Sequence, residues 1–98
     1  MFGRFRTEGR RYRHGPLWCS YIPDGDAVPP RVAYAIGRSV GTAVTRNRLR
    51  RRLRAAVAAE ATAFAPGWYL VGAQPAAVSL DHAALRAAVR SFAEQARS

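Results

Sequence analysis

The segment at residues 46–54 has the sequence RNRLRRRLR, which places six arginines in nine positions. At about 100° per residue, a helix here puts Leu49 and Leu53 on one face, followed by Val57 and Phe64, and leaves every arginine at the border of that face or opposite it. The segment contains no acidic residue that could form ion pairs one turn away. It therefore predicts a helix that buries only its leucine seam and presents a charged surface to an anionic partner.

The charge of the whole chain supports a polyanionic partner. The 98 residues, 49% of them hydrophobic, are enough for one domain, and the net charge is +10. Residues 1–54 hold thirteen arginines against three acids, whereas residues 55–98 hold three of each. The basic half thus carries the whole net charge, and nucleic acid is the first hypothesis for the partner, because guanidinium groups bind phosphate in bidentate fashion.

Hydrophobic periodicity and turn residues predict an α+β domain, a single α/β sandwich of order α-β-β-β-α-β-α. A mixed four-stranded sheet is covered by helices, and the β-α-β unit is right-handed by default. Thr42 or Thr45 caps the long helix, Pro66-Gly67 stops it, and Asp81 caps the last helix. The expected elements are a helix at 2–8, strands at 10–14, 17–22 and 31–37, a helix at 41–65, a strand at 68–73 and a helix after residue 81.

The strand at 31–37 alternates larger and smaller residues, so its two faces differ. Val32, Tyr34 and Ile36 are expected to face the core. The opposite, open side is then lined by small residues of this strand and by two residues of its neighbour: Ala33, Ala35, Gly37, Trp18 and Ser20. Trp18 and Phe2 would offer stacking platforms for bases, with ordinary core packing as the alternative for both.

The stretch AYAIGRSVGTAVTRNRLRRRLRAA, residues 33–56, resembles the signature of the bacterial ribonuclease P protein subunit. The flanking segments resemble the family as well, so the likeness covers nearly the whole chain, although the N-terminal segment is shorter than usual in the family. In fold, the resemblance implies a β-α-β unit that is left-handed, against the default. The residues that match the family pattern in order and spacing are Gly41, Ala43, Val44, Arg46, Asn47, Arg48, Arg51 and Arg54.

The resemblance implies a non-catalytic subunit that assembles with ribonuclease P RNA. That RNA uses Mg²⁺ ions to remove the 5′ leader from precursor tRNA, and no metal ligand is assigned to the protein. Contacts with the catalytic RNA near its metal ions are expected from Arg38, Arg46, Asn47, Arg48, Arg50, Arg51 and Arg54. A cleft between the arginine helix and the sheet is expected to take the leader, with contacts from Phe2, Trp18, Ser20, Ala33, Ala35 and Gly37.

Other functions are less well supported. A general RNA-binding or ribosome-associated protein of the same fold remains the main alternative. A DNA-binding domain would need base-reading side chains and a paired helix, and an autonomous ribonuclease would need a catalytic constellation around His14 or Cys19, neither of which is recognisable. Asp24 and Asp26 fit an Asx turn better than a metal pair. A lone cysteine and the lack of a long apolar run favour a cytoplasmic protein with no membrane partner. Because base-reading side chains and a paired helix are missing, no DNA partner is expected either.

Overall fold

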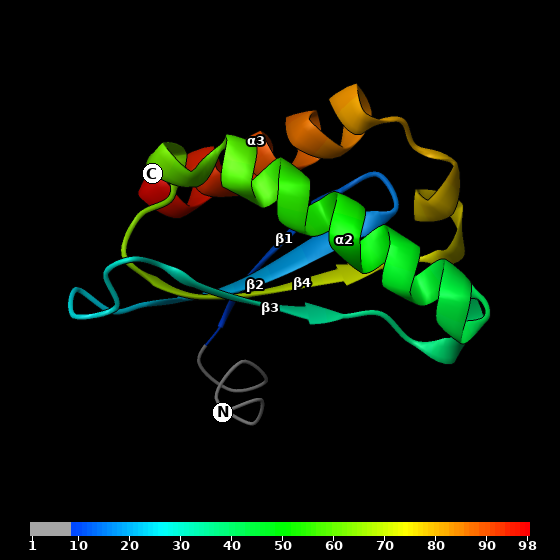
Figure 1. Cartoon of the computed structure of the whole chain (residues 1–98). Coiled ribbons are helices and arrows are strands. Elements are labelled where there is room, and N and C mark those ends of the chain that lie inside the picture. Colours follow the sequence, from blue (N-terminus) through cyan, green and yellow to red (C-terminus); the bar gives the residue numbers. More distant parts are fainter. Residues whose placement is uncertain (1–8) are drawn as a thin grey trace.

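The computed structural model describes residues 9–98, so the helix expected at residues 2–8 lies outside the described part (Figure 1). None of the helices within residues 9–98 is long and apolar enough to span a membrane. The strands are β1 (Arg10–His14), β2 (Leu17–Pro23), β3 (Arg31–Ala35) and β4 (Gly67–Ala73). The helices are α2 (Ala43–Ala59) and α3 (His82–Arg97), with 3-10 turns η1 (Arg38–Val40), η2 (Ala61–Ala63) and η3 (Pro75–Ser79).

The four strands form one mixed sheet in the order β1-β2-β4-β3. β2 pairs with β1 and β4 in antiparallel fashion, whereas β3 and β4 are parallel neighbours joined through α2. Both helices lie on the same side of the sheet, with β3 toward the viewer and β1 behind it (Figure 1). The β3-α2-β4 connection is left-handed (Figure 1), as the family resemblance implied. Most such connections are right-handed.

The hydrophobic core fills the space between the sheet and the two helices. Leu49 and Leu53 of α2 are 1% and 0% exposed, which confirms the predicted leucine seam. Alternate residues of each strand face this core, because successive side chains of a strand point to opposite sides. The core also includes Leu17, Cys19 and Tyr21 from β2, Tyr69 and Val71 from β4, and Leu85, Val89 and Phe92 from α3, with Val32 and Tyr34 of β3 packed against it.

The long helix ends earlier than the sequence predicted. α2 stops at Ala59 instead of continuing to Ala65, because Glu60 leaves the helical conformation and turns its carboxylate inward. There Glu60 accepts hydrogen bonds from Arg86 and Arg90 of α3. Phe64 consequently follows a 3-10 turn, and its ring packs edge-on against Tyr69 with 4.9 Å between ring centres.

The remaining elements agree closely with the expectations from the sequence. β1, β2 and β4 match their predicted ranges to within one residue, and Asp81 caps α3 by accepting a hydrogen bond from the amide of Ala84 at 2.8 Å. β3 ends at Ala35, two residues before the predicted end, so Gly37 lies in the connection to η1.

Candidate nucleic-acid interface

The connection before α2 fixes where the arginine-rich helix begins. Gly41 has φ of 153°, a backbone conformation that favours glycine, and an added Cβ would lie 3.0 Å from Cγ2 of Thr45. Thr42 caps the helix, since its hydroxyl accepts a hydrogen bond from the amide of Thr45 at 3.2 Å. Arg46 donates from Nε to the carbonyl oxygen of Gly41 at 3.2 Å, which ties the first arginine to this junction.

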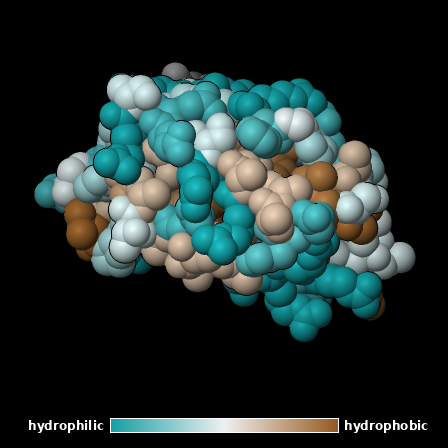
Figure 2. All heavy atoms as spheres, turned by 90° about the horizontal axis from the view of Figure 1, so that it is seen from above, coloured by the Kyte–Doolittle hydropathy of each residue, from teal (hydrophilic) through white to brown (hydrophobic). Residues whose placement is uncertain are grey.

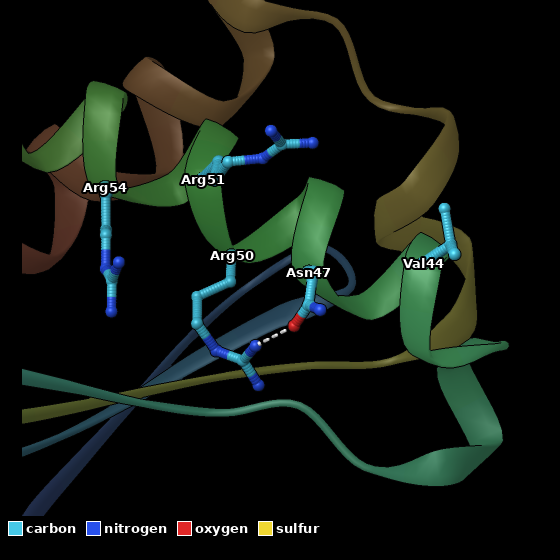
Figure 3. A pocket seen from close by; sticks show the side chains of 5 residues that line it. All are labelled: Val44, Asn47, Arg50, Arg51 and Arg54. Atoms are coloured by element: carbon cyan, nitrogen blue, oxygen red, sulfur yellow. Dashed lines mark hydrogen bonds between the residues drawn. The ribbon is translucent and has the colours of Figure 1, made fainter.

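The outward side of α2 carries an open depression of about 530 Å³ lined by Val44, Asn47, Arg50, Arg51 and Arg54 (Figure 3). Arg50 and Arg54 point toward β3 in this view, whereas Arg51 extends over the outside of the helix. Asn47 accepts a hydrogen bond from Arg50 at 2.6 Å, so the two side chains act as one unit. Val44 is 66% exposed beside them. Seen from above the helices, the surface is mostly hydrophilic with small apolar patches between (Figure 2).

We use the name arginine surface for the residues of α2 that were predicted to contact RNA: Arg46, Asn47, Arg48, Arg50, Arg51 and Arg54. Within residues 9–98, no carboxylate forms an ion pair with any of them; the ion pairs found there join Glu60 to Arg86 and Arg90. The first turn of α2 also contains no acidic residue, so the positive end of the helix dipole adds to the guanidinium charge. The arginine surface is therefore a concentrated, uncompensated positive field.

Arg54 of the arginine surface contacts the sheet, whereas Arg38, which lies outside the surface, is exposed. Arg54 lies over the ring of Tyr34 on β3, with 5.9 Å from its guanidinium carbon to the ring centre, which extends the arginine surface over the edge of the sheet. Burial raises the pKa of the Tyr34 hydroxyl, and the charge of Arg54 opposes that rise. Arg38, predicted to contact RNA, is exposed in η1 just before the helix.

Arg52 is used differently from the other arginines of α2. It donates to the carbonyl oxygen of Val78 at 3.3 Å and also to that of Leu80, so it links α2 to the segment before α3. Its side chain is half-buried. Arg52 therefore has a structural role, and it was not among the residues predicted to contact RNA.

The residues of β2 and β3 that were predicted to line the leader cleft lie on the opposite side of the sheet from α2. The sequence analysis placed the cleft between the helix and the sheet, but that space is filled by the hydrophobic core. Within residues 9–98, no helix covers the other side, which we call the open face (Figure 1). A small apolar cluster lies there, made of Trp18, Ile22, Ala33, Ala35, Trp68 and Leu70. The predicted alternation of Trp18, Ala33 and Ala35 is thus confirmed, while their relation to α2 was wrong.

The other predicted cleft residues differ in accessibility. Ser20 faces the same way by alternation but is only 1% exposed, and its hydroxyl has no hydrogen-bond partner among the described residues, so it is not accessible to a strand of RNA. Gly37 is exposed beyond the end of β3. Phe2 lies outside the described residues.

Two residues of the open face were missed by the sequence analysis. Trp68 of β4 packs in the apolar cluster, and its indole nitrogen donates to a carboxylate oxygen of Asp24 at 2.9 Å. Arg11 of β1 lies over the ring of Trp18, with 5.1 Å from its guanidinium carbon to the ring centre. The period of two in each strand carried the signal for their face, but their neighbours depend on strand order, which the sequence did not fix.

Cys19, Asp24 and Asp26, which the sequence analysis considered for catalysis or metal binding and set aside, have contacts that account for them structurally. Cys19 is fully buried, and burial raises the pKa of its thiol to about 12, which disfavours the thiolate form that a nucleophile needs. Asp24 accepts a hydrogen bond from the amide of Asp26 at 3.0 Å, which is the Asx geometry expected. Within residues 9–98, His, Cys, Asp and Glu side chains nowhere gather in threes as a metal site would require.

Comparison with known proteins agrees with this geometry. The family model described as Ribonuclease P matches residues 1–97. The ribonuclease P protein component of Roseiflexus castenholzii is 32% identical over 98% of this chain and 80% of its own length, and that of Symbiobacterium thermophilum is 42% identical over 92% of this chain and 79% of its own length.

Solved structures of low sequence identity share the fold. The ribonuclease P protein of Thermotoga maritima superposes with a TM-score of 0.86 at 17% identity, covering 96% of this chain and 89% of that one. The Staphylococcus aureus protein gives a TM-score of 0.83 at 16% identity, covering 98% and 88%. The sequence match over almost the whole length, together with the arginine surface and the sheet topology, shows that this chain belongs to the ribonuclease P protein family.

Proposed function

We propose that this chain, as the protein subunit of ribonuclease P, binds the catalytic RNA of the enzyme through its arginine surface and binds the 5′ leader of precursor tRNA on its open face. It takes part in tRNA processing, and the chemistry of leader removal is carried by the RNA. The protein supplies positive charge and positioning rather than a reacting group.

The observation that carries this proposal is the uncompensated charge of α2. Its arginines repel one another in the free protein, and within residues 9–98 no acid offsets them. A folded RNA brings phosphates close to several of these groups at once, and each phosphate contact releases counterions. Binding should therefore be tight at low salt and weaken steeply as salt rises.

The open face suits a single strand of variable sequence. Trp68 offers aromatic surface for stacking, and Arg11, held over the ring of Trp18, supplies charge. Ala33 and Ala35 have small side chains, which leave room beside the ring for a strand of RNA. Stacking on aromatic rings tolerates any base, because every base has a π face. A subunit that serves many precursor tRNAs needs this tolerance.

We assign the Mg²⁺ ions mainly to the RNA and the substrate. The arginine surface offers donors rather than oxygen ligands, and the amide oxygen of Asn47 already accepts a hydrogen bond from Arg50. These side chains would act near the metal ions by neutralising phosphate charge, which lowers the Mg²⁺ concentration that the RNA needs.

The test is reconstitution with the cognate RNA and a precursor tRNA at low Mg²⁺. Added protein should restore cleavage, and the double variant R46A/R48A should lose that effect. Arg97→Ala is the matched control, since it removes an exposed arginine in the last turn of α3, away from the arginine surface. Raising Mg²⁺ should rescue the double variant.

Two outcomes would overturn the proposal. Cleavage of precursor by the protein without RNA would place the chemistry in the protein. Equal stimulation by wild type and R46A/R48A would remove the arginine surface from the interface. The alternative, a general RNA-binding protein, predicts equal affinity for the cognate RNA and for an unrelated structured RNA of the same length.

A further inference from the structure

The open face holds one cation in place over an aromatic ring. Arg11 lies opposite Ser20 in the pairing of β1 with β2, and strand alternation places it on the same side as Trp18. Its guanidinium carbon lies 5.1 Å from the centre of the Trp18 ring, within the usual range of a cation–π contact. Arg11 is exposed, and none of the described carboxylates forms an ion pair with it.

The position of the Trp18 ring is itself set by the next strand. Trp18 lies opposite Gly72 of β4. A Cβ atom added to Gly72 would lie 1.9 Å from Cε2 and 2.0 Å from Cζ2 of the indole, so the ring occupies the space that a side chain at residue 72 would fill. The backbone of β4 therefore places the indole, and the indole places the guanidinium.

We propose that Arg11 binds a phosphate of the leader on the open face, and that Trp18 is a positioning residue which holds the Arg11 guanidinium for this contact. The proposal rests on the proposed function, because it takes the leader to lie on this face. A strand that approaches the indole from the side of β1 meets the guanidinium before the ring. The N–H groups of the Arg11 guanidinium remain free to donate to phosphate oxygens while its central carbon stays over the Trp18 ring.

Arg13 provides a matched comparison on the same strand. It is also exposed and, by alternation, lies on the same side of the sheet, opposite Trp18 in the pairing of β1 with β2. It makes no ring contact among the described residues, and its Nε donates to the carbonyl oxygen of Gly15 at 3.4 Å. Arg13→Ala therefore removes the same charge from the same face and leaves both residues of the Arg11–Trp18 contact unchanged.

The experiment measures the affinity of the reconstituted holoenzyme for precursor tRNA with a single-stranded leader and for mature tRNA without one, over a series of salt concentrations. The variants are R11A, R13A, W18A, W18F and R11A/W18A. Arg11→Ala should lower precursor affinity about tenfold, as expected for lost hydrogen bonds to a charged group, and leave mature tRNA unchanged. The slope of log affinity against log salt should become shallower by about 0.7 for one lost phosphate contact of a single strand.

The Trp18 variants separate positioning from stacking. Trp18→Ala should lower precursor affinity by no more than Arg11→Ala does. The double variant should bind the precursor as tightly as Arg11→Ala alone, because both substitutions remove the same phosphate contact. Trp18→Phe, which keeps a ring over Gly72, should stay close to wild type. Arg13→Ala should change the ratio of precursor to mature affinity less than twofold.

Several results would overturn this assignment. A wild-type ratio of precursor to mature affinity in Arg11→Ala would remove Arg11 from the leader site. A further loss on adding Trp18→Ala to Arg11→Ala would mean that the ring binds bases directly. An unchanged salt slope in Arg11→Ala would mean that Arg11 does not contact a phosphate. Failure of the wild-type protein to bind the RNA or to prefer the precursor would instead contradict the proposed function itself.

Discussion

Arg52 in the middle of α2 donates a hydrogen bond to the main-chain oxygen of Leu80, the residue that ends the turn η3. A second bond from the same guanidinium reaches the carbonyl oxygen of Val78. These bonds join α2 to the segment that leads into α3. One arginine of the cluster thus links α2 to the segment before α3, whereas the side chains of Arg48 and Arg51 make no hydrogen bond among the described residues.

Arg52→Ala should lower the free energy of unfolding by about 1–2 kcal/mol, because carbonyl groups lose a charged donor. Arg48→Ala is the control: Arg48 is exposed and has no hydrogen-bond partner among the described residues, so its loss should change stability by less than about 0.5 kcal/mol. Urea unfolding followed by circular dichroism checks both. Affinity for the RNA should show the opposite order, with the larger loss in Arg48→Ala.

Glu60 should make stability depend on acid pH. Hydrogen bonds from Arg90 and Arg86 hold the pKa of the Glu60 carboxyl at about 2, below its ordinary value of 4.5. The stabilisation is therefore complete above the unfolded pKa and is lost as the pH falls from about 4.5 toward about 2. The urea midpoint of the wild type should decrease as the pH is lowered through this range. Glu60→Gln should be less stable at pH 7 and show a flatter pH profile, and an unchanged profile would contradict the ion-pair assignment.

Gly72→Ala should destabilise the protein by about 1–3 kcal/mol, since the new methyl group would overlap the Trp18 indole. Gly37→Ala is the matched control, because an added Cβ there meets nothing within 4 Å. It should change stability by no more than about 0.5 kcal/mol. Thermal unfolding measures stability, and tryptophan fluorescence reports whether the indole has moved; equal melting temperatures for the two variants would rule out the close packing of Trp18 on residue 72.

Cys19 should be unreactive in the folded protein. The thiol is 0% exposed, and burial raises its pKa to about 12, so at pH 8 it is almost entirely protonated and sheltered. A coloured disulfide reagent should modify it only slowly in native buffer and rapidly in concentrated urea. Fast native modification would show that the core between β2 and the helices opens readily.

The sequence predicted the strands and their faces because that information is local. The alternation of Val32 and Tyr34 with Ala33 and Ala35 was enough to separate the core side from the open side, as the structure confirms. The leucine seam of α2 was equally visible, since two leucines one turn apart among arginines leave one buried side.

The features that the sequence missed depend on distant residues. α2 ends at Ala59 because Glu60 meets Arg86 and Arg90 from another helix, while the local pattern favours helix up to Pro66. Trp18, Ala33 and Ala35 lie on the side of the sheet away from α2, and not between α2 and the sheet as predicted, because the leucine seam of α2 packs on the other side. Arg11 was not recognised as the partner of Trp18 because strand pairing is a property of the assembled sheet.

The arrangement of α2 on one side of the sheet and Trp18 on the other has an electrostatic consequence. If catalytic RNA and leader bind as proposed, each would meet its own set of arginines on its own side of the sheet. The thickness of the domain would then keep the two polyanions apart, and this distance, together with the arginine charge on each side, would limit their mutual repulsion.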